Sequence, residues 1–252
     1  MATITRSTVE EKIQNGYDLK LGESISKGFE IYMKEWLLFS LYALTAFFIL
    51  VVSSITIIGL IFTAYPTMLG FAIAGEKVEN GQTLQFSDFF DGYKKTSQLA
   101  VLGLIYMGLV LLIIIPYFGV FFSVFFWENN FDGDFYPGTM FFGFFFVYIF
   151  FMMIASYLIQ VLLFFAPYLI YFGDYSPVEA LKNSFRLGKR NFWWLLLFVF
   201  IVGVISQMGA IAIYIGLLAT IPAGALISYS MVKNVLMSDE FSEIENIGEK
   251  NI

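Results

Sequence analysis

The sequence predicts an all-α integral membrane protein with six transmembrane helices in three hairpins, each preceded by a cytoplasmic interfacial amphipathic segment. Composition is the first reason: of 252 residues, 59% are hydrophobic and 13% are charged, whereas soluble domains average about 45–50% apolar and 25% charged residues. The second reason is that charge-free stretches long enough to cross a bilayer recur along the chain. The third is that every basic residue lies outside these stretches.

The charge-free stretches form three pairs of spans. A span needs about 17–25 mostly apolar residues, so we expect hairpins over about 36–75, 96–172 and 192–233. The middle pair is the longest, and its linker at 128–139 has the Gly, Asp and Pro of a loop. The first and third hairpins are short enough to be re-entrant instead, which would change the number of spans but not the side on which the loops lie.

The distribution of charge predicts the orientation. All 14 Lys and Arg residues precede the first hairpin, lie between hairpins, or lie at or beyond the end of the last one. If each hairpin crosses and returns, these residues share one side, and the positive-inside rule makes both termini cytoplasmic. We therefore expect a cytoplasmic tail at 1–23, a single membrane domain at 24–237 and an acidic cytoplasmic tail at 238–252.

Residues 176–198 combine a basic amphipathic helix with the start of a span. Ser176 suits the N-cap, Pro177 suits the first helical position, and Glu179 completes a capping box. We expect an interfacial helix with its bases toward anionic headgroups and its apolar face in the lipid boundary. That apolar face holds Val178, Leu181, Phe185 and Gly188. The expected interfacial anchors are Trp36, Lys182, Arg186, Lys189, Arg190, Trp193 and Trp194.

A similar plan occurs near the N-terminus, which indicates an internal duplication. Residues 24–39 also join an amphipathic helix to a span, and a shift of 156 positions superposes the two copies. The superposed pairs are Ile25 with Leu181, Phe29 with Phe185, Ile31 with Leu187, and Trp36 with Phe192. A weaker third copy lies at 86–95. The alternative is that any helix which enters a membrane acquires bases and aromatic residues, and we favour duplication.

The middle hairpin is rich in phenylalanine. Residues 118–151 hold 14 of the 31 Phe residues, beside three acids in the linker. They indicate either a docking face for a membrane partner or lipid, or rings that pack the hairpin and face acyl chains. The candidate contact residues are Phe121, Phe122, Phe125, Phe126, Phe141, Phe142 and Phe145.

The residue inventory excludes several chemistries. The chain has no cysteine and no histidine, which rules out disulfides, Ser-His-Asp catalysis and histidine-held metals. Gln160 and Gln207 are the strongest polar groups in the expected spans, and they form either a headgroup patch or, as we favour, interhelical contacts. The loop carboxylates show no metal-loop spacing, and solvated surface is the favoured interpretation; they are Asp88, Asp91, Asp174 and Glu179. We expect no catalytic residue, metal or cofactor.

Two stretches resemble an uncharacterised bacterial family of six-span membrane proteins, related to the membrane domain of some glycerophosphodiester phosphodiesterases. They are FAPYLIYFGDYSPVEALKNSFRLGKRNFWWLLLF at 165–198 and YDLKLGESISKGFEIYMKEW at 17–36. The resemblance covers most of the chain and implies no catalytic residues, because its motifs are structural. Some relatives carry the label beta-carotene monooxygenase, whose iron is held by histidines. This chain has none, so we reject that label here.

The sequence thus favours a non-catalytic accessory or scaffold protein of the bacterial inner membrane. Its expected partners are the lipid bilayer and a membrane protein that binds the Phe-rich middle hairpin, with no nucleic acid. The alternative is a transporter or lipid-handling permease. It would use spans that are broken or kinked at Pro66, Pro116, Pro167 and Pro222, together with the polar patch of Gln160 and Gln207.

Overall fold

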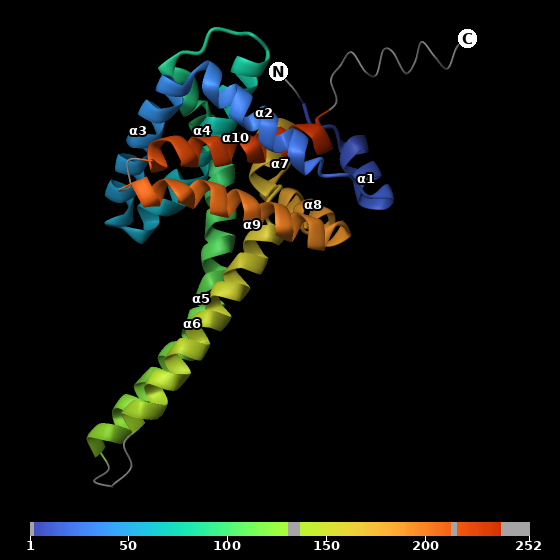
Figure 1. The fold of residues 1–252 in the computed structure, drawn as a ribbon. Helices are drawn as coiled ribbons and strands as arrows, with labels where there is room; N and C mark the ends of the chain where they lie inside the picture. The colour runs from blue at the N-terminus through green and yellow to red at the C-terminus, as the bar shows by residue number, and fades with distance from the viewer. Residues whose placement is uncertain (1–2, 131–136, 213–215, 238–252) are drawn as a thin grey trace. The chain divides into compact units, whose positions relative to one another are not determined.

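The computed structural model describes residues 3–130, 137–212 and 216–237 (Figure 1). The acidic tail at 238–252 and residues 131–136 of the linker lie outside the described residues. The helices are α1 (Arg6–Asn15), α2 (Leu21–Lys34), α3 (Trp36–Ser54), α4 (Ile57–Glu79), η1 (Phe86–Lys95), α5 (Thr96–Asn130), α6 (Pro137–Leu162), α7 (Ala166–Gly173), α8 (Pro177–Arg190), α9 (Phe192–Met208), η2 (Gly209–Ala212) and α10 (Leu217–Leu236).

The expectation of an all-helical protein is confirmed for the described residues. Their only β contact is an isolated antiparallel bridge between Ile4 and Met237. Five helices in this part of the chain are long and apolar enough to cross a membrane, which fits a multi-pass membrane protein. They are Trp36–Ser54, Ile58–Glu79, Phe86–Ser123, Phe145–Gly173 and Phe192–Ile211.

The helix expected as the last span, α10, is not among these five. Its C-terminal half carries Ser228, Tyr229, Ser230, Lys233 and Asn234, which lower its hydropathy. Much of α10 is also buried, from Pro222 through Val232 with the exception of Ala225. The helix is therefore surrounded mainly by protein, and its composition is less constrained by lipid.

The chain divides into two compact units, one of Met1–Gly103 with Val161–Ile252 and one of Leu104–Gln160. In the first unit, α10 packs against α2 and α9, and the three helices lie side by side in Figure 1. In the second unit, α5 and α6 touch through Tyr117, whose ring stacks on Tyr148 with centroids 4.9 Å apart.

The helix bounds agree with the predicted duplication. α2 and α8 both have 14 residues, and their first and last residues are 156 positions apart. A single residue joins each of them to the next helix, and the two residues have similar backbone angles. Glu35, before α3, has φ −134° and ψ 38°, and Asn191, before α9, has φ −122° and ψ 43°. The buried positions also correspond: Ser24 with Ala180, Gly28 with Ser184, Ile31 with Leu187, Tyr32 with Gly188, Phe39 with Leu195, Tyr42 with Phe198, Ala43 with Val199, and Ala46 with Val202.

The weaker third copy differs from the other two. Its amphipathic segment, η1, is a 3-10 helix and not an α-helix. The helix that follows nevertheless buries the expected face: Leu99, Leu102 and Gly103 are buried on α5 at the offsets from the helix start that Phe39, Tyr42 and Ala43 occupy on α3.

Contacts between the copies close a ring within the first unit. We take α2–α4 as copy one, η1–α7 as copy two and α8–α10 as copy three. The last helix of each copy then packs on the amphipathic segment of the next: α4 on η1, α7 on α8, and α10 on α2. α4 also contacts α7 and α10, and Phe172 of α7 meets Tyr229 of α10 at a ring-centroid distance of 6.3 Å. The last helices of all three copies therefore meet.

Three of the four prolines expected to break spans do not break their helices. Pro66, Pro116 and Pro222 lie inside α4, α5 and α10, which continue past them. Pro167 lies in the first turn of α7, where proline is tolerated because its missing N–H would have no helical partner. The helical conformation is interrupted just before Pro167, between the end of α6 at Leu162 and the start of α7 at Ala166.

Candidate functional site

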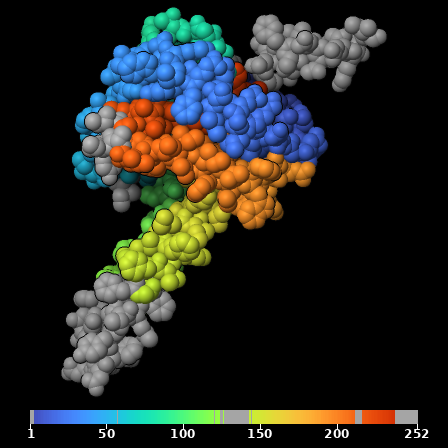
Figure 2. Space-filling model, viewed as in Figure 1, coloured from blue at the N-terminus to red at the C-terminus, as the bar shows by residue number. Residues whose placement is uncertain are grey.

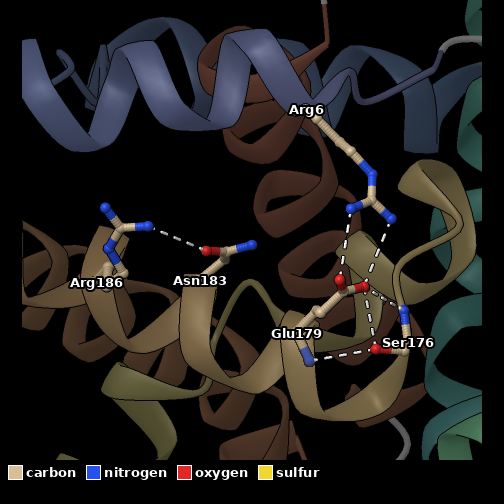
Figure 3. Close-up of polar contacts among 5 residues, drawn as sticks. All are labelled: Arg6, Ser176, Glu179, Asn183 and Arg186. Carbon is tan, nitrogen blue, oxygen red and sulfur yellow. Dashed lines mark hydrogen bonds and ion pairs between the residues drawn. The ribbon is translucent and has the colours of Figure 1, made fainter.

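Helix α1 is fixed along α8 by two ion pairs. The Arg6 guanidinium donates to both oxygens of the Glu179 carboxylate, at 3.4 and 3.5 Å (Figure 3). Further along, the Arg186 guanidinium donates to both oxygens of the Glu10 carboxylate, at 2.9 and 3.0 Å. Arg6 precedes Glu10 on α1, and their partners Glu179 and Arg186 follow in the same order on α8, so the two helices run parallel to each other. Figure 2 shows the dark blue surface of α1 beside the orange surface of α8.

The start of α8 has the capping box that the sequence predicts. Ser176 Oγ accepts a hydrogen bond from the backbone N–H of Glu179 at 3.4 Å, and the Ser176 N–H donates to Glu179 Oε2 at 3.3 Å (Figure 3). Glu179 therefore caps α8 and also binds Arg6 of α1. The hydrogen bonds from Ser176, followed by those from Arg6, hold the pKa of the Glu179 carboxyl below its ordinary value.

Most of the expected interfacial anchors are exposed. These exposed residues are Trp36, Lys182, Lys189, Arg190, Trp193 and Trp194. Among the expected anchors, Trp193 and Trp194 are more accessible than Trp36, at 77% and 66% exposure against 54%. Arg186 differs from the other bases because its guanidinium is bound by Glu10.

The expected apolar face of α8 divides into two faces. Val178 and Phe185 are exposed, as a lipid-facing surface requires. Gly188 is buried instead, on a face with Ala180, Ser184 and Leu187. This face is held by Ser184, whose Oγ donates to the Leu162 carbonyl at 2.9 Å and accepts from the Phe165 N–H at 3.1 Å. α8 therefore has three faces, one in the protein core, one exposed and one against α1.

A second polar cluster joins the C-terminal ends of α4 and α10. Lys233 Nζ lies 3.3 Å from Glu79 Oε2, and their side chains are only 16% and 14% exposed. Tyr229 donates its hydroxyl to the same Glu79 oxygen at 3.2 Å. Glu76, one turn earlier on α4, is 2% exposed. A mostly buried ion pair of this kind depends on both partners, because one charge alone would lack compensation.

The cluster on α4 and α10 is not foreseen from the sequence, because the charge-free stretch ends at Gly75 whereas the helix continues to Glu79. A helical signal was present nevertheless. Ala72, Gly75, Glu76 and Glu79 are spaced at intervals of three, one and three, so they share one helix face. Two small residues beside two carboxylates on one face indicate that this face packs closely on another helix.

The four loop carboxylates considered as metal ligands each have a basic partner. The pairs are Asp88 with Lys77, Asp91 with Lys94, Asp174 with Lys95, and Glu179 with Arg6. They are thus engaged in ion pairs, beyond the simple solvation that the sequence suggests. Within the described ranges, no three carboxylates lie close enough together to hold a metal ion.

The candidate phenylalanines belong to the unit of residues 104–160. Phe121, Phe122 and Phe126 are exposed on α5, and Phe145 on α6 contacts Tyr117 with ring centroids 5.8 Å apart. The side chains of Phe125, Phe141 and Phe142 lie outside the described part of the structure. The exposed rings are available for contact with lipid or with another protein.

The two candidate polar residues lie in different units. Gln160 ends the unit of residues 104–160, and Gln207 lies on α9 in the other unit; both are exposed. The serine near each one donates its hydroxyl to its own helix: Ser156 to the Met153 carbonyl at 3.1 Å and Ser206 to the Val202 carbonyl at 2.8 Å. Both interpretations of these two glutamines, the headgroup patch and the favoured interhelical contacts, therefore stay predictions.

Acidification should loosen α1 from α8. The hydrogen bond from Arg186 is the main cause that lowers the pKa of Glu10 from its ordinary value of 4.5, and the pKa of Glu179 is lowered too. A carboxyl with a lowered pKa stabilises the folded contact above its ordinary pKa, and this stabilisation is lost as the pH falls through the lowered value. Spin labels at Asn15→Cys and Gln82→Cys should give a narrow distance distribution at neutral pH and a broader one as the pH falls through the lowered pKa values of Glu10 and Glu179.

The matched control for the acidification experiment is a second label pair, Met33→Cys with Gln82→Cys. The Glu30 carboxyl on α2 also has a lowered pKa, through its hydrogen bonds with Lys34 and Lys27. Both of those bases lie on α2 itself, so their loss should not free α2 from α10. If the distance distribution between positions 15 and 82 stays as narrow at low pH as that of the control pair, the ion pairs do not hold α1.

Comparison of this chain with protein-family models, with curated proteins and with solved structures gives no match. The resemblance to a bacterial six-span family therefore stays a prediction that rests on residues 17–36 and 165–198.

Proposed function

We propose that this chain is a non-catalytic accessory subunit of the bacterial inner membrane that binds a membrane-protein partner through α5 and α6. In this proposal the chain crosses the bilayer six times, with α10 as the sixth span, and both termini are cytoplasmic. Membership in the six-span family suggested by residues 17–36 and 165–198 is part of the same proposal.

The observation that carries the proposal is the length of α5. It has 35 residues without interruption, which makes it about 52 Å long at 1.5 Å per residue. The hydrocarbon core of a bilayer is only about 30 Å thick. To fit wholly inside it, α5 would have to tilt by about 55°, beyond the usual range of 0–40°. At a tilt of about 40°, some nine residues of α5 still lie outside the core.

Counted from its C-terminal end, the nine surplus residues of α5 are 122–130, and they include the exposed rings of Phe122 and Phe126, four residues apart. Phe118, which is also exposed, lies one turn earlier on the same helix face. On α6, Phe146 and Phe150 are exposed at the same spacing. Large apolar surfaces outside the hydrocarbon core are usually covered by protein, and aromatic side chains are enriched in the buried centres of such interfaces. A second membrane protein is therefore the cover that we propose.

Site-specific crosslinking tests this proposal. A photoreactive phenylalanine analogue placed at Phe122 or Phe126 in cells should give one discrete protein adduct, because these rings contact the partner. The matched controls are Phe47 and Phe48 of α3. They are equally accessible, at 58% each against 61% and 63%, but α3 has only 19 residues and fits within the bilayer. The controls should crosslink to lipid.

A second arm tests whether the rings themselves bind the partner. With the photoreactive group at Phe118, replacing Phe121, Phe122, Phe125 and Phe126 by leucine should abolish the protein adduct while the hydrophobicity of the helix is retained. An adduct that survives these four changes, or one that forms equally at Phe47, would contradict the proposal. Crosslinks to lipid alone at every position would also contradict the proposal and would favour the alternative function, a transporter or lipid-handling permease.

That alternative, a transporter or lipid-handling permease, is favoured by the buried Glu76 on α4. Ionisable groups within membrane helices are costly and commonly mark pathways for ions or substrates. Glu76 lies inside a helix long and apolar enough to cross a membrane, Ile58–Glu79, and only 2% of its surface is exposed. It lies near the cytoplasmic end of the proposed span, however, beside the Glu79–Lys233 pair. We therefore place the permease second.

A further inference from the structure

The two equivalent helices α2 and α8 differ in charge. On α2, Lys27 and Lys34 both pair with Glu30, at 3.2 and 2.9 Å, and Glu23 pairs with Lys20, the residue before the helix. With two acids and two bases, the helix itself is neutral. α8 has one acid, Glu179, and four bases. Because the two helices have the same length, the same junction and corresponding buried positions, the fold does not require the surplus positive charge of α8. The surplus positive charge of α8 is therefore available to bind an anionic ligand.

The bases of α8 lie beside apolar side chains on its exposed face. Val178, Lys182, Phe185 and Lys189 follow one another at intervals of four, three and four residues, which places them on one stripe, and all four are exposed. Neither lysine has an ion-pair partner among the described residues. Apolar side chains that enter the acyl boundary next to lysines that reach the headgroups are the arrangement that interfacial helices use.

Arg186 and Arg190 flank this stripe on the side of α1. The Glu10 carboxylate binds both terminal nitrogens of Arg186, and Arg190 Nε lies 3.5 Å from the position that a Cβ of Gly16 would occupy, just after the end of α1. A guanidinium binds a carboxylate and a phosphate in the same two-pronged geometry. Glu10 therefore occupies the position where a headgroup phosphate would bind Arg186.

We infer that α8 is a binding site for anionic phospholipid headgroups, and that Glu10 of α1 competes with the headgroup phosphate for Arg186. Lys182 and Lys189 contact the bilayer surface while Val178 and Phe185 enter it. Arg186 joins them when α1 moves away. The occupant is a lipid surface and not an acidic protein, because the stripe mixes apolar and basic residues and leads directly to the exposed Trp193 and Trp194. Tryptophans at this position are typical of the membrane interface.

The test uses the full-length protein in nanodiscs of phosphatidylcholine mixed with phosphatidylglycerol, with the bound lipids quantified by mass spectrometry. The wild type should retain phosphatidylglycerol above its share in the nanodisc. The double variant Lys182→Gln/Lys189→Gln should lose this enrichment by about fivefold for each base removed. The matched control is Lys27→Gln/Lys34→Gln on α2, where Glu30 already binds both bases. It should leave the enrichment unchanged.

The competition is tested separately at Glu10. Glu10→Gln should raise phosphatidylglycerol retention, because Arg186 becomes available, and Arg186→Gln should cancel this gain. Anionic nanodiscs should also broaden the spin-label distance between Asn15→Cys and Gln82→Cys, whereas pure phosphatidylcholine and added inorganic phosphate should not. Equal loss in the α2 and α8 double variants would overturn the site, and no response to Glu10→Gln would overturn the competition. Neither result bears on crosslinking at Phe122.

Discussion

Replacing Gly28 by valine should separate α2 from α10 and strongly destabilise the protein. A Cβ at Gly28 would lie 2.6 Å from the Cα and the backbone nitrogen of Ile227. Backbone atoms in the middle of α10 cannot move aside as a flexible side chain can, so the two helices would have to part. Overpacking of a core costs about 1–3 kcal/mol where side chains can adjust. We expect about 3 kcal/mol or more here, because backbone must shift.

The contact at Gly28 matters because it closes the ring of copies. α10 belongs to copy three and α2 to copy one, so their contact joins elements separated by almost the whole length of the chain. Asn234 of α10 adds a hydrogen bond to Ser24 Oγ at 3.4 Å on the same face of α2. Parting the helices would break this bond and expose Ile31, which is fully buried.

Gly22 is the matched control, because it lies on the same helix and a Cβ there would have no atom within 4 Å. Gly22→Ala should stabilise the protein by about 0.5–1 kcal/mol, through the lower flexibility of the unfolded chain. The free energy of unfolding of both variants can be measured in detergent micelles by titration with a denaturing detergent. Equal stability of Gly28→Val and Gly22→Ala would contradict the close approach of α2 and α10.

A second glycine lies at a similarly close contact between two copies. A Cβ at Gly92 of η1 would lie 2.5 Å from the carbonyl oxygen of Pro66 in α4. This contact joins copies one and two in the way that Gly28 joins copies three and one. Although η1 is a 3-10 helix and α2 is an α-helix, both use a glycine where the last helix of another copy passes over them.

The parts of the fold that the sequence predicts are those that depend on residues close together in the chain. The capping box of α8 joins Ser176 to Glu179, three residues away, and both the motif and its hydrogen bonds are as expected. The shift of 156 positions also anticipates the helix bounds, because the same local pattern of bases, small residues and aromatic residues occurs twice. Local patterns are repeated by duplication, so they can be recognised without the structure.

The features that the sequence does not predict depend on contacts between distant residues. Nothing near Arg186 indicates that its partner is Glu10, 176 positions away in the chain. As a result, the expected lipid-facing row of four bases proves to have one member bound within the protein. The burial of α10 follows from its contacts with α2, α3, α4 and α9, none of which its own composition reveals. Its polar residues lower its hydropathy, but they do not show where its neighbours lie.

The second large effect is expected at the ion pair between α4 and α10. Replacing Lys233 by methionine should destabilise the protein by about 2–4 kcal/mol, because removing one partner of a mostly buried ion pair leaves the other without compensation. Tyr229 would still donate its hydroxyl to Glu79, but a neutral hydroxyl offsets only part of the cost of a buried charge.

The double variant Glu79→Gln/Lys233→Met distinguishes the loss of the charge pair from the loss of packing. The glutamine retains an oxygen that can accept the Tyr229 hydrogen bond, and no charge is left buried. Its stability should therefore return to within about 1 kcal/mol of the wild type, since removing both partners of a buried pair is often nearly neutral. In a double-mutant cycle, this recovery appears as a coupling energy of about 2 kcal/mol between the two sites.

The exposed pair of Lys34 and Glu30 is the control for this cycle, with side chains that are 47% and 49% exposed. Lys34→Met should cost less than about 1 kcal/mol, because water screens the remaining charge and Lys27 still binds Glu30. If Lys233→Met costs no more than Lys34→Met, then water reaches Glu79, and α4 and α10 are not packed as described. If the single variant is costly and the double variant recovers, the charge pair itself is the cause. Because Glu79 lies on the same helix as the buried Glu76, the junction of α4 and α10 would then be a place where buried charge holds the fold together.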